Sequence, residues 1–198
     1  MFDTLQSVSD KFPVIETERL TLRKFSVEDA AFIRELLNDD SFVRNIGDKG
    51  VRSDKDAAAY IENGPIASYE RFGFGLYAVE LKETGELIGM CGLLKRDSLA
   101  DPDIGFAFLP KFWKKGYAFE SAAAVIRYGT NVLGVKRVLA ITLPENAGSI
   151  RVLEKIGLRF ERMIKMSEDE PELKLFALES VLVEKYDPRI TRTNTKDA

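Results

Sequence analysis

The residues best suited to chemistry lie in the turn Trp113–Ala118 (W-K-K-G-Y-A), between an apolar strand-like segment that ends at Pro110 and a helical pattern. The first amides of a helix have no partner inside that helix, so a helix start attracts anions. Lys114 and Lys115 add positive charge, and Gly116 lets the backbone approach a ligand that a Cβ would hold off. The turn therefore predicts a site suited to a pyrophosphate.

The chain contains no histidine. This excludes Ser-His-Asp and Cys-His catalytic machinery and His-containing zinc sites, and we expect no metal. Any general base must be Asp, Glu, Tyr, Lys, Cys or a relayed water. The single cysteine, Cys91, lies in the run L-I-G-M-C-G-L-L, and we expect it to be a buried small hydrophobic residue rather than a nucleophile.

Composition predicts one soluble domain. The chain has 198 residues, of which 45% are hydrophobic and 31% charged. The net charge of −3 comes from interspersed acids and bases, so neither nucleic acid nor a membrane is an expected partner. One cysteine allows no internal disulfide, no run is long enough to span a bilayer, and the first residues lack signal-peptide features. We expect a cytoplasmic protein.

Apolar periodicity predicts a succession of strands and helices. Alternation in E-R-L-T-L-R-K-F favours a half-buried strand, and Ser26 and Ser53 precede acidic residues as helix N-terminal signals. The second helix is expected to run through Ile61 and to be ended by Gly64 and Pro65. Further strands are expected at 72–81, 87–95, 104–109, 137–143, 158–165 and 173–183, with a hairpin turn at 82–86 and helices at 118–133 and 147–156.

This order predicts a mixed α/β fold, with an antiparallel half built on a hairpin and a second half that contains a β-α-β unit. We expect residues 1–13 to form a flexible lead-in, residues 14–184 the domain, and residues 185–198 a polar tail.

Three motifs in the same order resemble the GNAT N-acetyltransferase superfamily, and especially its branch of ribosomal-protein N-terminal acetyltransferases. W-K-K-G-Y-A is similar to the pyrophosphate motif Q/R-x-x-G-x-G/A, with Trp113 in place of Gln or Arg, as is typical of this branch. T-E-R-L-T-L-R at 17–23 is similar to the branch's first-strand motif T-E-R-L-x-L-R. The N-x-x-S and E-K-x-G-F pattern is matched by Asn146, Ser149, Glu154, Lys155 and Gly157, with Leu158 replacing Phe. Each motif alone is moderate evidence, and together they cover most of residues 17–181.

The resemblance implies a central, mostly antiparallel twisted sheet that splays between two adjacent parallel strands and is flanked by helices. It implies acetyl-CoA as cofactor, with the pantetheine arm bonded to backbone in the opening like an added strand. The cofactor-binding residues that it implies are Phe106, Phe108, Leu109, Lys114, Lys115, Gly116, Tyr117, Ala118, Asn146 and Ser149.

The implied chemistry is direct transfer, in which an amine attacks the thioester, a backbone amide stabilises the oxyanion, a base takes the amine proton and an acid protonates the thiolate. Many members carry an acid Tyr in the helix after the Asn; Leu153 occupies that position here, and Ser149 is the nearest substitute. Asp103 is the candidate base, because some relatives carry a carboxylate on this strand. Glu145, Glu120 and a water relay are the alternatives.

The acceptor is open between the N-terminal amine of a protein or peptide and a small amine such as an antibiotic or polyamine, and the missing Tyr leaves a non-catalytic acyl-CoA sensor open. We expect an N-terminal amine, because an α-amine has a pKa near 8 against about 10.4 for lysine. In residues 45–69, which cover the acceptor side in this family, acids slightly outnumber bases, and this favours a cationic amine. We expect a monomer or homodimer.

Overall fold

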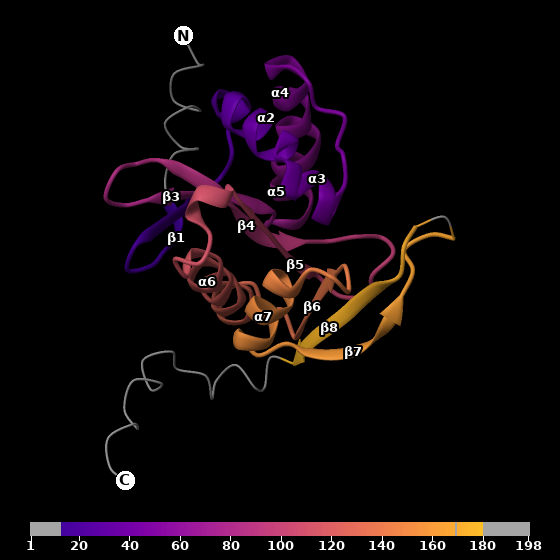
Figure 1. Cartoon of the computed structure of the whole chain (residues 1–198). Coiled ribbons are helices and arrows are strands. Elements are labelled where there is room, and N and C mark those ends of the chain that lie inside the picture. The colour runs from indigo at the N-terminus through magenta and orange to yellow at the C-terminus, as the bar shows by residue number, and fades with distance from the viewer. Residues whose placement is uncertain (1–12, 169, 180–198) are drawn as a thin grey trace.

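The computed structural model describes residues 13–168 and 170–179, and these form one eight-stranded sheet between two groups of helices (Figure 1). The strand order is β1-β2-β3-β4-β5-β6-β8-β7, and every neighbouring pair is antiparallel except β5 and β6. The strands are β1 Pro13–Glu16, β2 Leu20–Arg23, β3 Leu76–Leu81, β4 Leu87–Leu94, β5 Asp103–Phe108, β6 Arg137–Thr142, β7 Arg159–Ile164 and β8 Leu173–Glu179.

The fold class predicted from the sequence is confirmed. The domain limits stay predictions, since residues 1–12 and the tail at 185–198 lie outside the described residues, as do the last four residues of the strand expected at 173–183. Strand β1 was not expected. It pairs with β2, from Pro13 opposite Arg23 to Glu16 opposite Thr21, so Pro13, assigned to the lead-in, belongs to the sheet.

One face of the sheet is covered by the first helices of the chain, seen above the sheet in Figure 1. These are the 3-10 turn η1 Val27–Asp29, α2 Ala30–Asn38, α3 Asp40–Ile46, α4 Asp54–Ile61, the π-helical turn η2 Glu62–Ile66 and α5 Ala67–Phe72. Helix α4 starts where the sequence predicts: the Ser53 side chain accepts from the Asp56 N–H, and the Asp56 side chain accepts from the Ser53 N–H.

Gly64 and Pro65 do not end this helix, contrary to the expectation. The chain passes through η2, with Pro65 inside it, into α5. A π-helical turn bonds residue i to i+5, so the register shifts at the residue that has no N–H to donate. Phe72 is therefore the last residue of α5 rather than the start of a strand. Tyr69 of α5 joins this helix to the sheet, because its hydroxyl donates to the Leu76 carbonyl.

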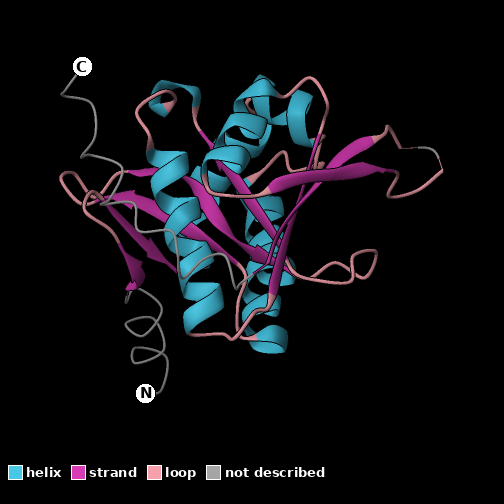
Figure 2. Cartoon of the chain, turned by 90° about the horizontal axis from the view of Figure 1, so that it is seen from below, coloured by secondary structure: helices cyan, strands magenta, loops and turns pink. Residues whose placement is uncertain are grey.

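The opposite face is covered by α6 Tyr117–Asn131 and α7 Ala147–Lys155. Gly129 of α6 lies against Leu93 of β4, whose Cδ1 would be 2.7 Å from a Cβ at that position, so the absent side chain allows close packing. The two helices touch where Lys155 Nζ lies 4.4 Å from the centre of the Phe119 ring. Figure 2 shows helices on both sides of the strands, with the ends of β7 and β8 extending beyond them as a two-stranded arm.

The parallel strands β5 and β6 meet at one point only within the described residues. Asp103 pairs with Leu139, and the Leu139 N–H donates to the Pro102 carbonyl at 2.9 Å. From there β6 stays paired along its length with β8, from Arg137 opposite Glu179 to Thr142 opposite Lys174. Beyond Asp103 the two parallel strands therefore separate, and the sheet splays between them as the family resemblance implies.

Candidate active site

The turn before α6 has the backbone that an anion site needs. The 3-10 turn η3 Pro110–Phe112 leads into it, and both Lys114 (φ 60°) and Gly116 (φ 87°) are left-handed. The first backbone bond of the helix runs from the Glu120 N–H to the Gly116 carbonyl at 3.0 Å, so the amides of Tyr117, Ala118 and Phe119 precede the helical ladder. With the two lysines beside them, these amides fit a phosphate or pyrophosphate group.

A clamp made of Thr17, Arg19 and Glu120 holds this turn against the first strands. Glu120 accepts from the Thr17 hydroxyl (2.6 Å), the Arg19 N–H (3.0 Å) and Arg19 Nε (2.7 Å). Arg19 Nη1 donates to the Lys115 carbonyl at 3.0 Å, and its guanidinium lies 4.6 Å from the centre of the Tyr117 ring. The clamp fixes the turn from both sides. Thr17 and Arg19 belong to the motif T-E-R-L, but the sequence did not show that they bind the turn before α6.

The clamp also settles what Glu120 does. Burial works to raise the pKa of its carboxyl, but the hydrogen bonds from Thr17 and Arg19 outweigh burial, and the pKa lies below the ordinary value. A carboxylate held in its charged form by several donors is a poor proton acceptor. Glu120, one of the alternative bases, therefore has a structural position at the turn.

The edge of β5 beside the opening is formed by Phe106 and Phe108. The Leu109 N–H donates to the Ile88 carbonyl of β4 at 3.1 Å, whereas the Pro102 carbonyl accepts from β6. Backbone groups alternate in direction along a strand, so those of the even-numbered residues face the opening and the Leu109 N–H does not. The Phe108 carbonyl accepts from the indole Nε1 of Trp113 at 2.7 Å. The N–H and C=O of Phe106 also face the opening, and its carbonyl, unlike that of Phe108, is not bonded to Trp113.

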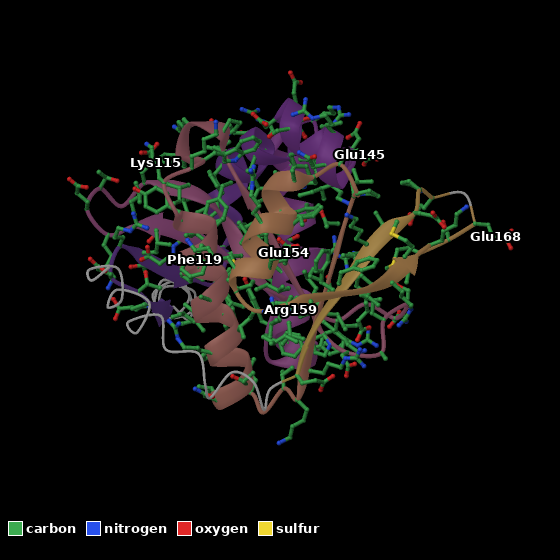
Figure 3. The ribbon with its side chains drawn as sticks, turned by 60° about the horizontal axis from the view of Figure 1, so that its bottom comes forward. Lys115, Phe119, Glu145, Glu154, Arg159 and Glu168 are labelled. Carbon is green, nitrogen blue, oxygen red and sulfur yellow. The ribbon has the colours of Figure 1, made fainter. Side chains whose placement is uncertain are left out.

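Asn146 and Ser149 stand at the carboxyl end of β6, at the start of α7. The Asn146 side chain caps the helix by accepting from the Ser149 N–H at 3.0 Å. The Ser149 side chain is half-buried. Lys115 before α6 and Glu145 before α7 lie toward the same end of the molecule (Figure 3), as expected for the segments that follow two parallel strands. Glu145 borders a shallow depression of about 580 Å³ beside the β7–β8 hairpin.

Asp103 lies where the two parallel strands part. Its side chain is 1% exposed, and both carboxylate oxygens accept from Arg96 Nε at 3.0 Å. Burial raises the pKa of the Asp103 carboxyl above its ordinary value, and Arg96 limits the rise. Such a shift moves a carboxyl toward the range useful for a general base. Arg96 was not predicted as a partner.

Asp103 and Ser149 are not brought together. Asp103 is level with Leu139, while Ser149 follows the end of β6 at Thr142. At about 3.3 Å per residue, Leu139 and Thr142 are about 10 Å apart. Asp103 and the chain that leads from β6 into α7 therefore lie at different levels along β6.

Leu153 and Cys91 are both buried, and for Cys91 this confirms the expectation. Leu153 is 1% exposed, so the place of the family's Tyr hydroxyl is filled by a core side chain. Cys91 is fully buried, and burial raises the pKa of its thiol to about 12.

Among the residues that the structure describes, no group of three or more His, Cys, Asp or Glu side chains could hold a metal ion. No described helix is long and apolar enough to cross a bilayer.

Three of the four acids of residues 45–69 are engaged locally. Asp48 forms an ion pair with Arg52, and the Asp56 side chain caps α4. Asp54 lies 3.3 Å from Arg34 of α2. Helix ends and nearby arginines therefore use most of these carboxylates, and the effect of this segment on an acceptor stays a prediction.

Comparison with known proteins identifies the family. Residues 19–159 match the model of the acetyltransferase (GNAT) domain. The chain belongs to the GNAT acetyltransferase family. An uncharacterized N-acetyltransferase of Bacillus subtilis, YoaA, is 31% identical over 157 residues, which are 78% of this chain and 87% of YoaA. A GNAT acetyltransferase from Bacillus anthracis has a similar structure (TM-score 0.71, 29% identity), covering 84% of this chain and 98% of that one.

Two further solved GNAT structures share the fold. RimL, a ribosomal alpha-N-protein acetyltransferase in complex with coenzyme A, has a TM-score of 0.74 at 16% identity and covers 85% of this chain and 98% of its own. A spermidine N-acetyltransferase from Vibrio cholerae, in complex with CoA and spermine, has a TM-score of 0.71 at 16% identity and covers 85% and 99%. The protein is an acetyltransferase, as the sequence predicted, and enzymes of this GNAT family use acetyl-CoA.

Proposed function

We propose that this GNAT enzyme transfers the acetyl group of acetyl-CoA directly to a primary amine, and that the amine is the N-terminus of a protein or peptide. The observation that carries the proposal is the combination of two parallel strands that part after Asp103 with a left-handed, lysine-flanked turn at the start of α6. The opening between the strands can accommodate the pantetheine arm of acetyl-CoA, and the turn supplies N–H donors for its diphosphate.

The fit of acetyl-CoA is supported residue by residue. The amides of the turn, from Lys114 to Ala118, would hold the diphosphate, with the Lys114 and Lys115 ammonium groups adding charge. The backbone of Phe106 would bond the arm as a neighbouring strand does, and Asn146 would border it from β6. When bound, acetyl-CoA supplies an acetyl group activated as a thioester.

The proton transfers are assigned to Asp103 and Ser149. Asp103 has a raised pKa but a side chain that is 1% exposed, so it would accept the proton of the acceptor amine through a water. Ser149 would donate to the departing thiolate, because it stands at the start of α7, where the hydroxyl is half-buried and Leu153 leaves no alternative on that helix position.

The acceptor is proposed from chemistry. An α-amine with a pKa near 8 is neutral, and hence nucleophilic, in a far larger fraction at pH 7 than a lysine side chain with a pKa of about 10.4. The likeness to RimL supports a protein N-terminus, and the likeness to the spermidine enzyme supports a small polyamine; both are likenesses of fold. We also propose that the enzyme acts in the cytoplasm.

A competition experiment tests this proposal. Peptides that carry both a free N-terminus and an internal lysine are incubated with acetyl-CoA, spermidine and the enzyme, and products are mapped by fragmentation in a mass spectrometer. We expect the acetyl group on the N-terminal nitrogen. Acetylation mainly of lysine, or of spermidine alone, would overturn the choice of acceptor, and binding of acetyl-CoA without any release of free CoA would point to the non-catalytic sensor.

A further inference from the structure

A pocket of about 290 Å³ lies beside the point where the parallel strands part, on the face covered by α4, η2 and α5. Its apolar surface comes from residues such as Pro65, Leu76 and Leu94. Leu94 is the residue of β4 that pairs with Asp103 of β5, and Asp103 in turn pairs with Leu139 of β6. The pocket is therefore at the closed end of the splay, on the side opposite α6 and α7.

The ionisable residues that line this pocket are three cations and one tyrosine. They are Arg71, Lys95, Arg96 and Tyr60, and no Asp or Glu is among the lining residues. We name this set the basic pocket. Asp103 pairs with Arg96 from beside the pocket, and Asp48 and Asp56 of the preceding segment are engaged at Arg52 and at the start of α4.

Neighbouring groups hold the three cations in place, and N–H donors of these cations stay available to a ligand. Arg96 uses Nε for Asp103, and the hydrogen bonds found among the described residues give its Nη1 and Nη2 no acceptor. The Lys95 ammonium donates to the Leu99 and Ala100 carbonyls at 2.7 and 2.8 Å, which fixes it without cancelling its charge. The Arg71 guanidinium lies 4.8 Å from the centre of the Phe72 ring, and within the described part of the chain no ion pair is formed by it.

Strand geometry sets the scale between the basic pocket, next to Asp103, and the part of β5 whose backbone faces the opening. Phe106, whose backbone faces the opening, is three residues beyond Asp103 on β5, a separation of about 10 Å. An extended peptide spans about 3.3–3.6 Å per residue, so 10 Å is about three residues, and the side chain of the second or third residue is within reach of the pocket when the N-terminus reacts.

We propose that the basic pocket binds an anionic group of the acceptor, so that the preferred acceptor is a peptide N-terminus followed by Asp or Glu at its second or third position. This inference rests on the proposed function for its acceptor, while the binding of an anion in the basic pocket can be measured alone. Guanidinium groups bind carboxylates through two parallel hydrogen bonds, and the apolar surface beside them lowers the competition from water.

The test uses peptides that differ only in charge at the second and third positions, Glu-Glu against Gln-Gln, with a fluorophore at the far end. Anisotropy measures their binding to the full chain at low salt in the presence of CoA, and mass detection measures their acetylation. We expect the acidic peptide to bind at least about 10-fold more tightly, an advantage that shrinks as salt is added.

Two matched variants separate the pocket from general charge. Arg71→Gln should remove most of the preference for the acidic peptide, whereas Arg34→Gln, an exposed helical arginine outside the pocket, should leave it unchanged. Equal binding of the two peptides by the wild type, or equal losses in both variants, would overturn the inference. Free glutamate that displaces the peptide would support the anion site and assign it to a small acceptor instead. Acid-selective binding without acetylation of the peptide would keep the pocket and refute the N-terminal acceptor.

Discussion

Replacing Gly116 by alanine tests the anion turn against a matched control elsewhere in the chain. Gly116 has φ 87°, and Gly85, in the hairpin turn between β3 and β4, has φ 69°. An alanine held in a left-handed conformation costs about 1–2 kcal/mol, so both variants should lose this much stability, or about 2–8 °C in Tm. A Cβ at Gly85 meets nothing within 4 Å, whereas one at Gly116 would lie 3.3 Å from Arg19 Nη2.

Only Gly116→Ala should therefore disturb ligand binding. The new methyl group must displace either the turn or the Arg19 guanidinium, which also bonds the Lys115 carbonyl. Losing one hydrogen bond to a charged phosphate costs about 1.5–3 kcal/mol, so the Kd for CoA should rise about 10- to 150-fold. Calorimetric titration of both variants with CoA, beside their unfolding curves, gives the answer. The reasoning is refuted if Gly116→Ala binds CoA like the wild type, or if Gly85→Ala weakens CoA binding as much.

Three other substitutions address the clamp and the proton transfers. Glu120→Gln should cost about 1 kcal/mol of stability at pH 7, after allowance for the exposure of Arg19. Because folding lowers the pKa of Glu120, its stabilisation is fully present above the unfolded pKa near 4.3 and is lost as the pH falls through the folded pKa. The difference in unfolding free energy between variant and wild type, measured in urea, should therefore disappear in acid. A difference that stays constant with pH would contradict the clamp. Asp103→Asn should lower kcat/KM by about 10²- to 10⁴-fold and remove an acidic limb that lies above the ordinary aspartate pKa near 3.9; an unchanged profile would exclude Asp103 as the base. Ser149→Ala should lower kcat with little change in the Kd of acetyl-CoA, and wild-type turnover would assign the thiolate proton to water.

Much of the fold could be predicted because local signals and tertiary structure agree. The Ser53 and Asp56 capping pair fixes the start of α4, and two apolar runs on either side of the turn at Gly85 give β3 and β4 with their hairpin. Prediction failed where tertiary structure overrides a local sequence rule. Pro65 ends helices that bond i to i+4, yet a π-helical turn accommodates it, and β1 is a short edge strand whose register depends on β2 rather than on its own pattern.

In the candidate site, too, the features set by neighbouring residues were predictable and those set by the folded chain were not. The turn at Gly116 was predictable because its chemistry depends on consecutive residues. The clamp between Arg19 and Glu120, and the pair of Arg96 with Asp103, form only in the folded chain, so spacing along the sequence did not show which residues pair. The charge of residues 45–69 shows the same limit, because counting acids cannot tell which of them cap helices or pair with arginines.

The central claim is that the parted strands and the turn before α6 form the acetyl-CoA site, and mapping amide chemical shifts during titration with CoA tests it most directly. The account predicts the largest shifts at the backbone amides of Lys114–Phe119 and of Phe106, with Gly85 in the distant hairpin unchanged. Shifts confined to other parts of the sheet, or a saturating titration that leaves the amides of Gly116 and Phe106 unmoved, would contradict it.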